Sequence, residues 1–240
     1  MYSDSFFNAL KEGFTSSYVL PFAIAMKATT ENIAMISAAP QMMGSLFQLF
    51  ASDLLNILKN RKKAIVFLAL IDAILWLPIL LIPFAWKNNI VLLINLLVIQ
   101  SIVVSLLHPI YNSFIGNIIP QDNRGSVVGG LNKISGITVL VSSLLAGFFL
   151  SKMENWMTGF GVIFFVAFLS RIISTLFRTR FYEPSLKYES KAESLFHFSR
   201  SMMATNFGKF VLYQSCVKFA LGISTPFFIV YMLQVLKMDM

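Results

Sequence analysis

The stretch GNIIPQDNRGSVVGG, residues 116–130, interrupts a chain that otherwise consists largely of long apolar segments. Hydrophobic residues make up 57% of the sequence and charged residues only 12%, about half of their usual share in soluble domains. This stretch nevertheless combines four glycines, a proline and the polar run 121–124. So specific a composition between two apolar segments predicts a tight turn that joins two membrane helices.

Seven apolar segments are long enough to cross a bilayer as helices, which takes about 20 residues each. They cover residues 6–27, 31–57, 64–86, 90–116, 128–152, 157–178 and 208–236. These segments are continuously apolar, whereas the strands of a membrane β-barrel alternate between polar and apolar residues. With a mean hydropathy of +0.73, the sequence predicts an all-α integral membrane protein with several spans.

The positive charges are distributed unevenly between the two sides of the predicted spans. If the N-terminus is cytoplasmic, twelve Lys and Arg lie at cytoplasmic positions and four face outside, namely Lys27, Lys87, Lys152 and Lys237. This bias follows the positive-inside rule and predicts a cytoplasmic N-terminus in the plasma membrane. It also accounts for the net charge of +8, so we expect no nucleic-acid partner. A single cysteine, Cys216, provides no disulfide and no cysteine cluster for a metal, and we expect no cofactor.

The seventh span repeats the first. GFTSSYVLPF, residues 13–22, aligns without gaps to GISTPFFIVY, residues 222–231. The only long connection, 179–207, contains a capping-box spacing and predicts a cytoplasmic linker with a short surface helix. We therefore predict a six-helix bundle over 1–178, the linker over 179–207, and the first helix of a truncated second bundle over 208–240.

This arrangement resembles the major facilitator superfamily of secondary transporters, whose halves are parallel repeats of six spans. The superfamily loop between spans four and five reads Gly-Asp, then Pro, then Arg-Gly, then Gly. The corresponding residues here are Gly116, Asn117, Pro120, Arg124, Gly125 and Gly129, with Asn in place of Asp. A second superfamily motif, between spans two and three, is degenerate here. Its positions read Ser52, Asn56, Lys59 and Arg61, and only Arg61 keeps the superfamily pattern.

The residues of the 116–130 stretch suggest how such a turn works. Its glycines allow close helix contact or positive φ, and Pro120 helps to end the preceding helix. The rigid guanidinium of Arg124 is suited to binding exposed carbonyls at a helix end. The resemblance implies that this contact forms in one access state and breaks in the other. The alternative is a rigid turn with an arginine on the cytoplasmic side.

The resemblance also implies that spans one, four and seven line a cavity for a small solute, with a proton or ion as a candidate coupling partner. The candidate lining residues are polar or aromatic: Ser16, Tyr18, Gln100, His108, Asn112, Gln214 and Ser224. The spacing of the three residues on span four allows one helix sector to carry them all. His108 is a candidate proton carrier, and the alternative is that it only makes a structural hydrogen bond.

Ionisable residues inside spans are costly and need partners. Asp72 and Arg171 lie equally far from the cytoplasmic face, so we predict a buried ion pair between them. The resemblance places their spans on the outside of the bundle, away from the solute. Glu12 is another predicted buried charge, with Lys133 or Arg124 as its partner and proton coupling as an alternative role.

Small residues recur every seven positions on two spans. The first set is Ser37, Gly44 and Ala51, and the second is Gly129, Gly136 and Ser143. Such stripes allow close helix contact. The resemblance places both spans at the seam between the two halves, and the alternative is packing inside the six-helix bundle.

Three other classes of protein remain open. A seven-helix receptor or retinal protein would use Lys218, but its topology would be opposite to the one predicted here. A membrane enzyme would need clustered catalytic groups, and the two histidines, His108 and His197, lie far apart, so we expect no catalytic residues. The third is a non-transporting remnant or half-transporter that needs a partner half. The expected partners are the lipid bilayer, a solute, and a missing C-terminal or partner half.

Overall fold

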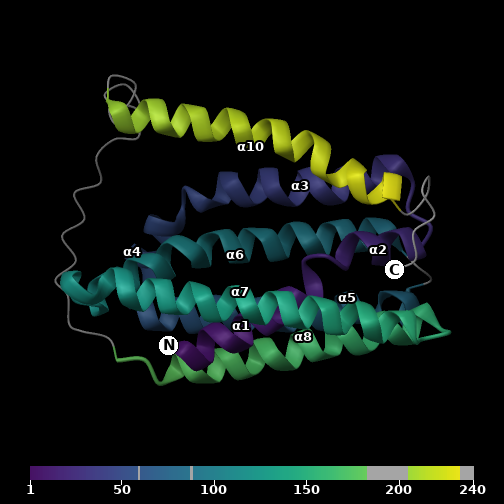
Figure 1. Cartoon of the computed structure of the whole chain (residues 1–240), viewed down its shortest axis with the longest axis horizontal. Helices are drawn as coiled ribbons and strands as arrows, with labels where there is room; N and C mark the ends of the chain where they lie inside the picture. The colour runs from purple at the N-terminus through teal and green to yellow at the C-terminus, as the bar shows by residue number, and fades with distance from the viewer. Residues whose placement is uncertain (59, 87–88, 183–204, 233–240) are drawn as a thin grey trace. The chain divides into compact units, whose positions relative to one another are not determined.

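The computed structural model describes residues 1–58, 60–86, 89–182 and 205–232, which fall into two compact units divided at residues 183/184. The described residues form helices and no strand. The first unit contains α1 (Tyr2–Thr15), α2 (Val19–Ala25), α3 (Thr30–Gln48), α4 (Ala51–Leu58), α5 (Arg61–Ala85), α6 (Ile90–Ile118), α7 (Gln121–Ser151) and α8 (Trp156–Thr179). The second contains α10 (Asn206–Val230) (Figure 1).

Several helices begin at an asparagine whose side chain caps the first turn. The Asn60 side chain accepts from the Lys63 N–H at 2.7 Å before α5, and that of Asn89 accepts from the Leu92 N–H at 3.0 Å before α6. Such caps satisfy N–H groups that have no partner within the helix. The starts of these helices are therefore fixed by the local sequence.

Four of the described helices, α5 to α8, are long and apolar enough to cross a membrane. They agree with the predicted all-α membrane fold. The first predicted span, 6–27, is not continuous, because α1 and α2 are separated at residues 16–18. Pro21 has no N–H to donate to the Ser17 carbonyl, and the Tyr18 N–H turns back to the Thr15 carbonyl at 3.0 Å.

The second predicted span, 31–57, is also divided. It forms α3 and α4, which are separated at Leu49 and Phe50. The N–H groups of these two residues donate to carbonyls three residues back, at 3.4 and 3.0 Å, which is the tighter 3₁₀ pattern. The continuous second span was therefore a wrong prediction, because apolar composition alone does not reveal where a helix tightens and ends.

The polar turn predicted for residues 116–130 is much shorter than expected. α6 continues to Ile118 and α7 begins at Gln121, so only Ile119 and Pro120 lie outside helices. Pro120 is the N-cap of α7, with a φ of −54° that suits a proline ring. Among the described glycines none has a positive φ. The glycines of this stretch that follow Pro120 thus belong to a helix, so positive φ, one of the two predicted uses of these glycines, does not occur.

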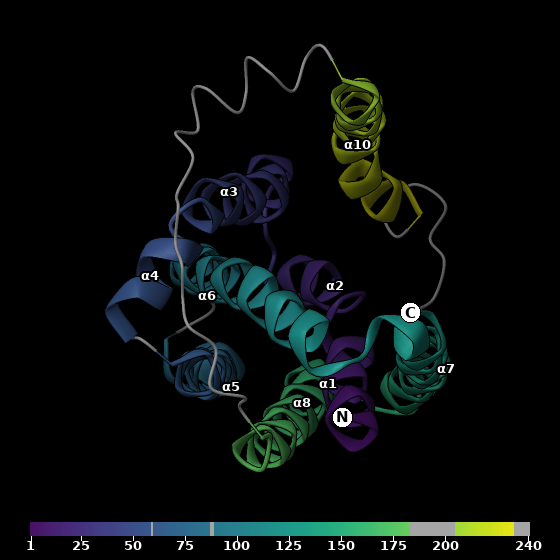
Figure 2. The same ribbon diagram turned by 90° about the vertical axis from the view of Figure 1, so that its left-hand side faces the viewer.

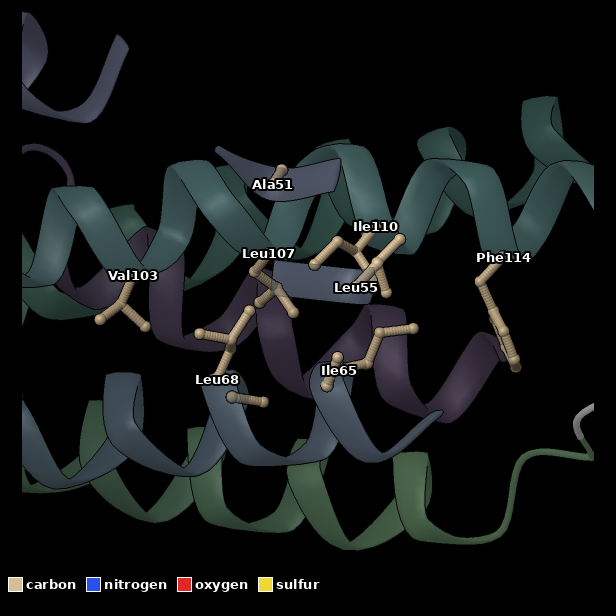
Figure 3. Packing of buried hydrophobic residues seen from close by; sticks show 10 residues of the cluster. Ala51, Leu55, Ile65, Leu68, Val103, Leu107, Ile110 and Phe114 are labelled. Atoms are coloured by element: carbon tan, nitrogen blue, oxygen red, sulfur yellow. The ribbon is translucent and has the colours of Figure 1, made fainter. Parts of the chain in front are cut away.

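Within the first unit the helices pack in a continuous series, with α3 on α6, α6 on α5, α5 on α8, α8 on α1 and α1 on α7 (Figure 2). The short helix α4 packs on both α5 and α6. Together these three helices bury an apolar cluster, shown in Figure 3, that includes Ala51, Leu55, Ile65, Leu68, Val103, Leu107, Ile110 and Phe114. This cluster fixes one side of the unit, and α1 lies on another side between α7 and α8.

The second unit contains α10. Thr205 is its N-cap, and the threonine side chain accepts from the Gly208 N–H at 3.1 Å. α10 covers most of the predicted seventh span. The predicted surface helix of the linker lies outside the described residues, and the assignment of α10 to a second bundle stays a prediction.

Two glycines allow the closest helix contacts in the first unit. A Cβ added at Gly13 would lie 2.8 Å from the Val139 carbonyl oxygen of α7, and one at Gly44 would lie 2.6 Å from the Ser105 hydroxyl of α6. The small-residue stripe that contains Gly44 therefore packs inside the bundle. At Gly129 and Gly136 of the second stripe, nothing in the described structure lies within 4 Å of an added Cβ.

We predict that Gly13→Ala destabilises the protein by about 1–3 kcal/mol, because the new methyl group meets a backbone oxygen that cannot move aside. Thermal unfolding in detergent micelles measures this loss. Gly136→Ala is the matched control on an open position and should be neutral or slightly stabilising. Equal stability of the two variants would contradict the close approach of α1 and α7.

Candidate functional site

A cavity of about 510 Å³ lies among α1, α2, α5, α6, α7 and α8 of the first unit. Its lining is rich in polar side chains, although the surrounding helices are largely apolar. The polar residues that line it are Asn8, Lys11, Glu12, Thr15, Ser16, Asp72, Gln100, His108, Tyr111, Asn112, Asn132, Arg171 and Arg178. A concave site with converging polar groups is the usual form of a small-molecule site.

Asp72 is the central charge of this cavity and is fully buried. Its carboxylate lies 2.6 Å from Nε of Arg171 and 3.7 Å from Nζ of Lys11. Gln100 also donates to the carboxylate, at 3.1 Å. Arg171 in turn donates to the side-chain oxygen of Asn8. Side chains from α1, α5, α6 and α8 therefore meet at one carboxylate.

A second buried carboxylate, Asp4, holds the beginning of α1. It pairs with Arg178 at 2.7 Å and accepts from Ser174 at 2.6 Å and from Tyr111 at 2.8 Å. The Arg178 guanidinium also lies 4.7 Å from the centre of the Tyr111 ring. This network lines a smaller cavity of about 200 Å³ beside the first one. The two carboxylates together fix α1 against α5, α6 and α8.

An aromatic cluster adjoins the polar cavity where α2 meets α8. Trp76 lines the cavity and also packs on Phe164, with ring centres 5.4 Å apart. Phe22 of α2 is fully buried against Phe160 and Phe164, at 5.3 and 5.0 Å. The indole N–H of Trp76 is buried and has no hydrogen-bond partner in the described part of the chain.

A sequence family accounts for this combination of apolar helices and a polar cavity. The family model described as Major Facilitator Superfamily matches residues 5–240. The chain belongs to the major facilitator superfamily. Members of this superfamily are membrane transporters, in agreement with the membrane-length helices α5 to α8. No curated protein and no solved structure matches the chain.

The cavity contains four of the seven lining residues suggested by the superfamily resemblance. These four are Ser16, Gln100, His108 and Asn112. Tyr18 is not among its lining residues, because its hydroxyl donates to the Ser143 carbonyl of α7. Gln214 and Ser224 lie on α10 in the second unit, so their part in a superfamily cavity stays a prediction.

The charges predicted to be buried fall into two groups. Asp72 and Arg171 form the predicted ion pair but line the cavity, contrary to the expected place of their spans away from the solute. The reason is that α5 and α8 pack side by side, and α8 also packs on α1. Glu12 and Lys133 are exposed instead of buried, since their faces of α1 and α7 are left uncovered. Among the described residues Glu12 forms no ion pair with Lys133 or Arg124.

Three charged residues of the site were missed by the sequence analysis: Asp4, Lys11 and Arg178. Lys11 and Arg178 count only among the twelve Lys and Arg predicted to lie at cytoplasmic positions. The spacing of Asp4, Asn8, Lys11 and Thr15 would have been a usable signal, because steps of three or four residues place side chains on one helix face. This polar face of α1 is the one that meets the two buried networks.

The superfamily motif between α6 and α7 contains one direct contact. Arg124 donates to the Gly116 carbonyl in the last turns of α6, where helix carbonyls lack partners within the helix. Asn117 is exposed, and an added Cβ at Gly125 or Gly129 meets nothing within 4 Å in the described structure. The switching of this contact between access states stays a prediction.

The second superfamily motif lies on α4 and at the start of α5. Ser52 is exposed on α4, Asn56 belongs to the same helix, and Arg61 is the first residue of α5. Lys59 lies outside the described residues. In the described ranges no group of three or more His, Cys, Asp or Glu is placed to hold a metal ion.

We predict that Asp72→Asn destabilises the protein by about 3–5 kcal/mol, because Arg171 would remain buried without its counter-charge. Thermal unfolding of the purified protein measures the loss. The double variant Asp72→Asn/Arg171→Gln should recover only part of it, since the uncompensated charge of Arg171 is then removed while that of Lys11 remains.

Glu12→Gln is the control for this experiment, because it removes an exposed carboxylate from the same cavity. It should leave the unfolding temperature nearly unchanged. If Asp72→Asn were as stable as Glu12→Gln, the ion pair would not support the packing of α5 and α8.

Proposed function

We propose that the chain is the N-terminal part of a secondary transporter, a permease that moves a small solute by alternating access. The observation that carries the proposal is the polar cavity of about 510 Å³ inside a bundle of membrane helices. Its volume lies within the usual range for small-molecule sites. Membership of the superfamily supports transport rather than catalysis as the role of this cavity.

The proposed orientation has the N-terminus in the cytoplasm and the helices in the plasma membrane. The distribution of Lys and Arg supports it. In this orientation the contact between Arg124 and Gly116 lies on the cytoplasmic side and serves as a latch of one access state. His108, which lines the cavity, is the proposed carrier of a coupling proton.

A second half of six helices completes the cavity in this proposal. The uncovered face of α7 supports a second half, because Gly129 and Gly136 leave room for a closely packed helix. The repeat of residues 13–22 in 222–231 supports α10 as the first helix of that half. The other helices come from the same natural chain or from a partner subunit. A remnant without transport activity is the alternative.

Alternating access can be tested by labelling a cysteine at Asn112 in the natural protein, in its own membrane, after replacement of native cysteines by serine. We expect Asn112→Cys to react with a membrane-impermeant thiol reagent from either side, in intact cells and in inside-out vesicles, because the cavity opens to each side in turn. Ile99→Cys, on an exposed apolar position of α6, is the control and should stay unlabelled from both sides.

Labelling of Asn112→Cys from one side only would contradict alternating access and favour the non-transporting remnant. Labelling from neither side would contradict the water-accessible cavity itself.

A further inference from the structure

The cluster of Lys11, Asp72 and Arg171 contains two cations and one carboxylate. Asp72 and Arg171 have 0% and 2% of their side chains exposed, and Lys11 has 12%. Arg171 alone neutralises the Asp72 carboxylate, at 2.6 Å. The ammonium of Lys11, at 3.7 Å from the same carboxylate, therefore adds a positive charge to a largely dehydrated site. Such a charge is costly unless another anion compensates it.

No other acid near the cavity balances Lys11 within the described structure. Asp4 is occupied by Arg178, Ser174 and Tyr111. Glu12 lines the cavity but is exposed, and it lies beyond ion-pair distance of Lys11. An exposed carboxylate is well hydrated, so its attraction to the Lys11 ammonium is weakened by solvent. The compensating anion must therefore come from outside this set of residues.

The hydrogen-bonding groups around the cavity are also unbalanced, because several donors lack an acceptor. The Lys11 ammonium makes no hydrogen bond among the described residues and lies 5.8 Å from the centre of the Trp76 ring. The buried N–H groups of Trp76 Nε1 and Arg178 Nη1 also lack partners in the described part of the chain. All three groups are donors, and the two buried N–H groups are costly without acceptors. A ligand rich in acceptor oxygens would correct this shortage.

We propose that the solute of this cavity carries an acidic group, a carboxylate or a phosphate, and that Lys11 binds that group. This inference rests on the proposed transport function and names the chemical class of the solute. Arg171 stays paired with Asp72 and Asn8, so it holds the cluster in place while Lys11 faces the solute. Hydrogen bonds between an ammonium and an anionic oxygen are among the stronger ones in proteins.

The test compares the purified natural protein with its Lys11→Met variant, using acetate and inorganic phosphate as anionic probes and acetamide as the uncharged probe. Binding is followed by the rise in unfolding temperature as probe is added at constant ionic strength. We expect saturable stabilisation of the unmodified protein by at least one anionic probe and none by acetamide. Lys11→Met should bind that anion at least about tenfold more weakly. Lys152→Met, outside the polar cavity, controls for general salt effects and should behave like the unmodified protein.

Without any probe, Lys11→Met should be at least as stable as the unmodified protein, because Asp72 and Arg171 then form a balanced pair. A clear loss of stability or of folded protein in Lys11→Met would overturn the proposal, since Lys11 would then be a structural partner of Asp72. Equal stabilisation by acetamide, no saturable effect of either anion, or unchanged anion binding in Lys11→Met would overturn it as well.

The labelling of Asn112→Cys separates this inference from the proposed function. Two-sided labelling together with unchanged anion binding in Lys11→Met would support the proposed transport and contradict the anion site. One-sided labelling together with Lys11-dependent anion binding would support the anion site and contradict the proposed transport.

Discussion

The neutralisation of buried charge across helices is the constraint on which this structure depends. α1 is the least apolar helix of the first unit, since it carries Asp4, Lys11 and Glu12 within 14 residues. Asp4 is compensated by Arg178, and Lys11 approaches the carboxylate that Arg171 compensates. α1 therefore occupies its place through the ion pair of Asp4 with Arg178 and the hydrogen bond of Asn8 with Arg171, rather than through apolar surface alone. These charged and polar side chains also form part of the polar walls of the two cavities.

Close packing and polar contacts act together along α1 and α2. Gly13 brings α1 against the backbone of α7, and Tyr18 then donates to the Ser143 carbonyl of the same helix. Between these two contacts the helix is interrupted, and α2 continues into the aromatic cluster around Phe22. Each segment of the first span is thus held by a different kind of interaction: ion pairs, backbone approach and aromatic packing.

The sequence predicted those features that depend on composition over many residues. The long apolar helices α5 to α8 follow from hydropathy, and the pairing of Asp72 with Arg171 follows from their matching depth. The positions of Gln100, His108 and Asn112 on one sector of α6 follow from helix periodicity. The interruption at 49–50 could not be predicted, because it depends on single backbone hydrogen bonds, whereas the one at 16–18 lies next to Pro21, which has no N–H to donate. The role of Lys11 in the cavity was missed, because a lysine near the end of a span is also typical of the positive charges that orient a helix in the membrane.

The ion pairs of α1 have a consequence for the order in which the protein is made. The Asp4 carboxylate lacks its counter-charge until Arg178 has been made, and Ser174 and Arg178 lie 170 and 174 residues later in the chain. A nascent chain emerges N-terminus first, so α1 reaches the membrane long before its counter-charges do. The first span is therefore among the last to reach its final environment. Its packing is complete only after α8, the sixth predicted span, has been made. The last step of assembly then joins the first helix of the chain to this late one.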